Sequence, residues 1–183
     1  MLKAIDVANF FVDLANSDPD DCMTNLRVNK LLYFAQAWSV VRRNKPLFEE
    51  DMQAWKYGPV VPEVYTAFSA CGRERIASVS GDYSLNSFSS DELDLLIDVA
   101  REYGKYTSST LVDFTHEKNG PWDKVYVEGQ KNIISKESLK TYFSQQNTLK
   151  SFSLPEAMES YVGYRDSADG LLILPKEYDD ESE

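Results

Sequence analysis

The chain has 183 residues, of which 43% are hydrophobic and 13% aromatic, which is enough for the core of one domain with, at most, a small appendage. Its 30 acidic and 19 basic residues give a formal net charge of −11, which argues against nucleic acid as a partner because phosphate contacts require a basic surface. The sequence has no run of ~18 apolar residues and no amino-terminal signal peptide, so it predicts no membrane partner and a cytoplasmic location.

Two helices are expected near the amino terminus. Apolar residues recur at helical spacing over residues 4–16, and Asp18-Pro19-Asp20 breaks the pattern. Leu26–Arg43 is apolar around most of its circumference, which is typical of a central helix that is buried on several sides. Thr24 is a suitable N-cap for this second helix. The polar residues of this second helix gather on one narrow strip, which contains Asn25, Asn29, Gln36 and Arg43.

The segment after the central helix contains the only Tyr-Gly-Pro of the chain. Met52–Tyr57 is short, aromatic and roughly alternating, so we expect a strand or an extended crossing that ends at Gly58 and Pro59. Pro62 suits the first turn of a helix that Gly72 closes. We expect the Gly58 backbone to need a freedom that a Cβ atom would restrict, so this turn is predicted to be structural.

Helix signals dominate the rest of the chain after a short strand predicted at Arg75–Val79. Ser89 and Glu92 form a capping box at the start of a helix that ends at Gly104. Further elements are predicted as helices from Thr107 or Ser108 to His116, from Ser135 onward and over residues 153–162, and as a strand at Leu171–Leu174. Gly120 and Pro121 form a second structural turn, which is expected to fold Trp122 back onto the core. The sequence therefore predicts a mainly α fold, a compact multi-helix domain with a minor β element.

His116 is the only histidine, and a small hydrolase could use it as a base beside Asp113, Glu117 or Cys71. A histidine near the end of a helix has a stronger alternative, because it interacts favourably with the helix dipole and can cap carbonyls. The sequence contains no metal-ligand spacing, phosphate loop or paired-carboxylate motif, so we predict no catalytic residue, no metal and no cofactor. An enzyme is therefore the weaker class of function, and turnover that survives His116→Ala would exclude that hydrolase.

Aromatic and lysine side chains around the central helix form a richer set of candidates. Most large aromatic residues at helical spacing lie in the core, but a partly exposed minority would form a contact patch, because Tyr and Trp dominate interface energetics. The lysines could pair with an acidic group on a partner, or could extend to water from a buried stem. The predicted partner-binding residues are Lys30, Tyr33, Trp38, Trp55, Lys56, Tyr57, Tyr65 and Trp122.

Three stretches contain spaced aromatic residues, two of them with a Gly-Pro turn: NKLLYFAQAW at 29–38, KPLFEEDMQAWKYGPVVPEVY at 45–65 and THEKNGPWDKVY at 115–126. Together they resemble the signature of the SocA-like antitoxins, the Panacea domain. The resemblance extends over roughly residues 4–145 and implies a mostly helical domain that neutralises a cognate toxin protein by binding it. One member type is an adaptor that hands its toxin to the ClpXP protease, so delivery to a Clp-type protease is an alternative.

The resemblance also suggests how the chain is divided. Residues 1–150 are predicted to form the antitoxin domain, and residues 151–183 a C-terminal extension with an acidic end that we expect to be disordered. The net charge of −11 favours a basic toxin through faster steered encounter, although the same charge would serve solubility equally well.

Overall fold

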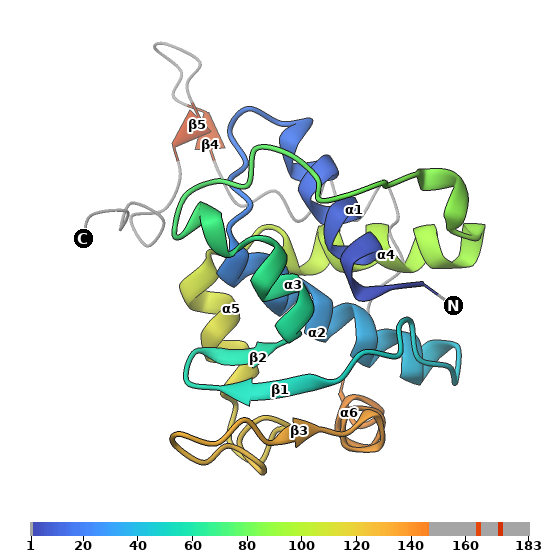
Figure 1. Ribbon diagram of the computed structural model, residues 1–183, viewed down its shortest axis with the longest axis vertical. Coiled ribbons are helices and arrows are strands. Elements are labelled where there is room, and N and C mark those ends of the chain that lie inside the picture. The colour runs from blue at the N-terminus through green and yellow to red at the C-terminus, as the bar shows by residue number, and fades with distance from the viewer. Residues whose placement is uncertain (1, 147–163, 166–171, 174–183) are drawn as a thin grey trace. The chain divides into compact units, whose positions relative to one another are not determined.

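The computed structural model describes residues 2–146, 164–165 and 172–173, and the chain divides into two units, Met1–Lys150 and Ser151–Glu183 (Figure 1). Within its described residues the first unit contains six α-helices and a three-stranded sheet, so the predicted mainly helical fold is confirmed. In the second unit β4 (Tyr164–Arg165) pairs antiparallel with β5 (Leu172–Ile173), which confirms part of the predicted strand. The helix expected over residues 153–162 and the acidic end lie outside the described residues.

The first unit is built around α2 (Asn25–Arg42), as its sequence predicts. Thr24 caps this helix, because its Oγ1 accepts a hydrogen bond from the Arg27 backbone N–H at 3.2 Å. Every residue of α2 from Arg27 to Val40 is buried. Helices on several sides cover it (Figure 1): α1 (Ala4–Asn16), α4 (Ser90–Tyr103), α5 (Ser108–Thr115) and α6 (Lys136–Phe143).

Among the described residues, no helix is both long and apolar enough to span a bilayer.

The strip of polar residues on α2 is buried as well, at Asn25, Asn29 and Gln36. Gln36 is 2% exposed; its side-chain oxygen accepts from the Leu47 N–H at 2.7 Å, and its Nε2 donates to the Phe48 carbonyl at 2.8 Å. The backbone after Pro46 is irregular and buried, so its polar groups need partners. Gln36 thus replaces the hydrogen bonds that regular secondary structure would provide.

The small sheet contains more strands than the sequence predicts. β1 (Met52–Trp55) lies between β2 (Gly58–Val60) and β3 (Ile133–Ile134), and both neighbours are antiparallel to it. A strand within the predicted Met52–Tyr57 segment is confirmed, but Gly58 and Pro59 begin a second strand, because the turn consists of Lys56 and Tyr57. Pro59 is tolerated in β2 because this is an edge strand. The backbone on its outer side pairs with no neighbouring strand of the sheet, so a missing N–H there breaks no hydrogen bond.

The segment after β2 departs from the sequence-based expectation in two places. Helix α3 (Pro62–Ala67) begins at Pro62 as expected, but a 3₁₀ turn at Ser69–Cys71 separates its end from Gly72. The strand predicted at Arg75–Val79 is wrong, because the structure shows no strand there. Side chains hold the following backbone instead: Asn9 donates to the Ser80 carbonyl at 2.8 Å and accepts from its N–H at 2.9 Å.

The later helices begin where their caps predict. Ser89 and Glu92 form the capping box of α4, while Thr107 and Ser135 accept hydrogen bonds at the first turns of α5 and α6. Trp122, which follows the turn at Gly120 and Pro121, is 7% exposed and belongs to the core, as expected.

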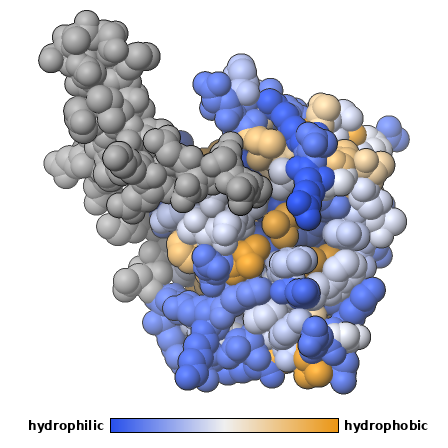
Figure 2. Space-filling model, turned by 90° about the vertical axis from the view of Figure 1, so that its left-hand side faces the viewer, coloured by the Kyte–Doolittle hydropathy of each residue, from blue (hydrophilic) through white to orange (hydrophobic). Residues whose placement is uncertain are grey.

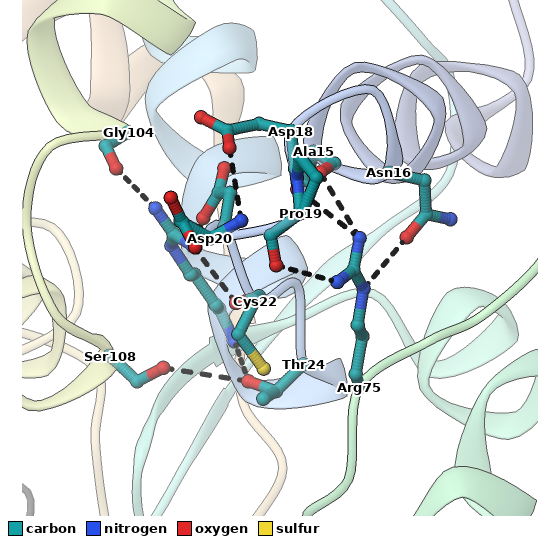
Figure 3. Close-up of polar contacts among 12 residues, drawn as sticks. Ala15, Asn16, Asp18, Pro19, Asp20, Cys22, Thr24, Arg75, Gly104 and Ser108 are labelled. Atoms are coloured by element: carbon teal, nitrogen blue, oxygen red, sulfur yellow. Dashed lines mark hydrogen bonds and ion pairs between the residues drawn. The ribbon is translucent and has the colours of Figure 1, made fainter.

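Two arginines, Arg75 and Arg27, hold the connection between α1 and α2, and Figure 3 shows the contacts of Arg75. Arg75 donates to backbone carbonyls within Ala15–Pro19, where the last carbonyls of a helix lack helical partners. Arg27 pairs with Asp21 and also donates to the Gly104 carbonyl at the end of α4. Arg27 therefore anchors the start of α2 to the preceding connection and to the end of α4.

Replacing Gln36 tests the importance of the buried polar strip. We expect Gln36→Leu to lower the free energy of unfolding by about 2–3 kcal/mol, because the Leu47 N–H and the Phe48 carbonyl would be buried without partners. Urea denaturation measures this loss. Gln130→Leu, at an exposed loop position, is the matched control and should change stability by less than about 0.5 kcal/mol. Equal effects of both changes would show that Gln36 merely fills space.

Candidate protein-binding groove

A groove of about 770 Å³ lies where the start of α2, the β1–β2 hairpin and α3 meet; we call it the hairpin groove. Figure 2 views the molecule from the side on which the hairpin turn lies, where apolar residues are interspersed among hydrophilic ones. The residues that line the groove are Thr24, Asn25, Leu26, Asn29, Trp55, Lys56, Tyr57, Val60, Tyr65, Gly72, Arg73 and Ser108. Aromatic rings from the hairpin and α3 thus face polar side chains at the helix start.

Two tyrosines in the aromatic wall of the groove are exposed. Tyr57, in the hairpin turn, is 62% exposed and Tyr65 is 41% exposed. The rings of Trp55 and Tyr65 pack with centroids 4.9 Å apart, and the Lys131 ammonium lies 4.4 Å from the Trp55 ring centroid. Rigid rings with one polar end are the side chains that contribute most at protein interfaces.

Two asparagines of α2 hold this wall in place. Asn25 donates from Nδ2 to the Tyr65 carbonyl at 2.9 Å, and Asn29 donates to the Asn25 side chain at 3.0 Å. The Asn29 side-chain oxygen also accepts from the Val61 N–H at 2.9 Å, just before α3. Both asparagines are buried, and the two hydrogen bonds of Asn29 are shielded from water. The groove is therefore formed before any partner arrives.

Lys30 lies beneath the hairpin rather than at the surface. It is 0% exposed, and its Nζ donates to the Pro59 carbonyl at 2.9 Å. Burial lowers the pKa of Lys30 to about 7, because an ammonium that leaves water loses its hydration. In the described part of the chain it forms no ion pair, and its burial is inconsistent with a head group that extends to water. Lys30 holds the hairpin by one internal hydrogen bond.

A stack of three rings supports the other strand of the hairpin, β1. The His116 ring stacks on Trp122 with centroids 3.7 Å apart, Tyr126 stacks on Trp122 at 4.3 Å, and Trp122 Nε1 donates to the Trp55 carbonyl at 2.9 Å. Burial, and then the charge of Lys30, lower the pKa of His116. Its Nε2 is buried and has no hydrogen-bond partner among the described residues. His116 thus contributes a packed aromatic face beneath the groove.

The predicted partner-binding residues separate into three layers. Trp55, Lys56, Tyr57 and Tyr65 line the groove. Lys30 and Trp122 lie behind it and hold its backbone. Tyr33 and Trp38 are 1% and 2% exposed and pack in the core, where Trp38 Nε1 donates to the Tyr103 hydroxyl at 3.0 Å.

The predicted structural turns support the same surface. Gly58 and Pro59 start β2 above Lys30, whereas Gly120 and Pro121 precede Trp122 in the chain. Sequence reasoning missed Asn25, Asn29, Leu26 and Arg73 as groove residues. The spacing of the two asparagines, one helical turn apart on a buried helix, is the signal that could have identified them.

Comparisons with known proteins agree on one family. Residues 28–123 match the family described as Antitoxin SocA-like, Panacea domain. The chain is 36% identical over 129 residues to a protein of Caulobacter vibrioides (strain NA1000 / CB15N) named Antitoxin SocA, and the alignment covers 65% of this chain and 68% of that protein. No solved structure matches the chain. The matched residues include the hairpin, α3 and Trp122, and hence most of the groove and its support.

Replacing Gly58 tests how closely the hairpin lies on Lys30. Gly58 has φ +97°, and a Cβ atom there would lie 2.7 Å from Thr115 Oγ1 and 2.8 Å from Lys30 Cε. We expect Gly58→Ala to lower the free energy of unfolding by roughly 2–4 kcal/mol. Gly129, with φ +76° and no atom within 4 Å of such a Cβ, is the matched control, for which strain alone predicts a loss of about 1 kcal/mol. Equal losses would mean that the close contact has no energetic consequence.

The pH dependence of stability tests the burial of Lys30. Its folded-state pKa of about 7 is below its ordinary value of 10.5, so between these values the unfolded chain binds more protons and the stability of the folded protein rises with pH. Relative to Lys30→Met, which keeps the length and removes the charge, the free energy of unfolding of the unmodified protein should increase by on the order of 1.4 kcal/mol per pH unit from pH 7 to 10. Parallel stability profiles would contradict the assignment of a buried, pKa-shifted ammonium.

Proposed function

Because the chain belongs to the SocA-like antitoxin family of Panacea-domain proteins, we propose that it neutralises a cognate toxin protein by binding it directly through the hairpin groove. Membership of an antitoxin family implies a toxin as partner. The observation that carries the choice of surface is the exposure of Tyr57 and Tyr65 beside a groove whose backbone is fixed from below. A large apolar side chain of the toxin would be desolvated between these rings.

The internal support of the groove favours tight binding. Asn25, Asn29 and Lys30 already use their polar atoms to hold the hairpin and α3, so little backbone order remains to be gained when a partner binds. Binding free energy then is not spent on ordering the loop, and this preorganisation raises affinity for a given buried area.

The net charge of the chain adds to the contacts that the aromatic rings of the groove make. A formal net charge of −11 speeds the encounter with a basic toxin, whereas contacts of the groove set how long the complex lasts. The two contributions can be separated, because long-range attraction weakens as salt shortens the Debye length and the desolvated aromatic contacts do not.

Delivery of a bound toxin to a Clp-type protease is the alternative mechanism. The two mechanisms differ in what neutralisation requires. A purified mixture of this protein and its toxin, without protease, should show inhibition that is complete at a fixed molar ratio if binding alone neutralises. Inhibition that appears only after protease and ATP are added would support delivery instead.

Removing the exposed rings tests the groove directly. Tyr57→Ala and Tyr65→Ala should each weaken binding of the toxin at least about tenfold, or about 1.4 kcal/mol, because each deletes an aromatic contact from the wall. The first protein to test as the toxin is the product of the gene next to the one that encodes this chain, and calorimetric titration measures its affinity. Leu85→Ala removes another exposed apolar side chain, 48% exposed and outside the groove lining, and should leave affinity unchanged. If both tyrosine variants fold and bind normally, the groove is not the binding surface.

A further inference from the structure

The charged side chains that line the hairpin groove are both cations, in a chain that is acidic as a whole. They are Lys56, in the hairpin turn, and Arg73, which follows the 3₁₀ turn after α3. The polar residues that share the lining, such as Thr24 and Asn25, are uncharged, and no described residue of the lining is an aspartate or a glutamate. The charge of the lining is therefore opposite in sign to the net charge of −11.

Neither cation has an acidic partner in the part of the chain that the structure describes. Lys56 and Arg73 are exposed, and neither forms an ion pair with another described residue. The Lys56 ammonium lies 5.6 Å from the Tyr57 ring centroid, a contact that leaves its positive charge in place. Arg73 has a planar head group, which can donate two parallel hydrogen bonds to one carboxylate. The groove thus presents two positive charges to a partner.

The two cations share the groove with the exposed rings but belong to different elements. Lys56 directly precedes Tyr57 in the hairpin turn, whereas Arg73 comes after the end of α3, the helix that carries Tyr65. All four side chains line the same groove of about 770 Å³. A ligand that contacts both the rings and the cations must therefore combine an apolar group with negative charge. Two cations on separate elements match two negative groups better than one.

We propose that the segment of the toxin that enters the hairpin groove is acidic, with a carboxylate side chain on either side of a large apolar one. This inference rests on the proposed function and names the chemistry of the partner at that surface. The apolar side chain packs on the rings of Tyr57 and Tyr65, while the carboxylates accept hydrogen bonds from Lys56 and Arg73. In this complex the toxin is basic over most of its surface, which the net charge attracts, and acidic where it enters the groove.

Three blocked peptides set the lining of the groove against the net charge of the chain. They are acetyl-Gly-Glu-Leu-Glu-Gly-amide and the same peptide with both glutamates replaced by glutamine or by lysine. Each is titrated into the full, isotope-labelled chain and followed by the backbone NMR signals of Lys56 and Tyr57. We expect the glutamate peptide to saturate with a dissociation constant on the order of millimolar, the glutamine peptide to bind at least roughly fivefold more weakly, and the lysine peptide more weakly still.

The net charge alone predicts the reverse order, because a chain with a charge of −11 attracts the lysine peptide and repels the glutamate peptide. Tighter binding of the lysine peptide, or equal binding of all three, would therefore overturn the proposal. So would a glutamate peptide that does not saturate up to about ten times the expected dissociation constant.

Replacing single cations localises the effect. Lys56→Gln and Arg73→Gln should each weaken binding of the glutamate peptide by roughly threefold or more and leave the glutamine peptide unchanged. Lys45→Gln removes an exposed cation near the opposite end of α2, outside the groove lining, so it controls for net charge and should change affinity little. An equal loss in Lys45→Gln would overturn the proposal in favour of diffuse repulsion.

The same variants, titrated with the toxin, separate this inference from the proposed function. Both hold if Tyr57→Ala, Lys56→Gln and Arg73→Gln all weaken binding of the toxin. Weaker binding in Tyr57→Ala alone would overturn the acidic segment and leave the groove as the toxin-binding surface. Unchanged binding in all three variants would overturn the groove itself.

Discussion

The hydrogen bonds between the buried polar side chains of α2 and the backbone that follows this helix are the contacts on which the rest of the structure depends. Gln36 holds Leu47 and Phe48, and Lys30 holds Pro59. Asn29 fixes the start of α3 through Val61. Apolar packing alone would tolerate a shifted hairpin, whereas each of these polar groups is costly unless the backbone occupies one position. The helix thus sets both the path and the register of the segment that forms the hairpin groove.

In the proposed complex, support of the groove and contact with the toxin fall to different residues. Lys30, which is difficult to bury, has an internal partner in the Pro59 carbonyl, whereas the rings of Tyr57 and Tyr65 are exposed and available to a partner. A family that must hold a toxin gains from such a surface, because a preformed wall lowers the entropic cost of association. In the proposed complex, the net charge of −11 acts at longer range and speeds the encounter with a basic toxin.

Local signals in the sequence were sufficient for the helices, because caps such as Thr24, Ser89 and Ser135 act within one turn of themselves. The pairing of β3 could not be predicted in this way, since a strand of two residues at Ile133–Ile134 exists only through contact with Met52 and Gln53, far away in the chain. The same limit applies to the candidate site. Periodicity placed Lys30 on a buried helix but could not reveal the Pro59 carbonyl that accepts its hydrogen bond, and exposure separated Tyr57 from Tyr33 only once the fold was known.

Hydrogen–deuterium exchange of the chain alone and in complex with its toxin tests the central claim most directly. We expect slower exchange in the complex at Lys56 and Tyr57 and over residues 65–73, because these backbone amides border the hairpin groove. Exchange within α2 should hardly change, since that helix is already buried in the free protein. Unchanged exchange at the hairpin turn and at residues 65–73, together with protection elsewhere in the chain, would contradict the assignment of the groove as the toxin-binding surface.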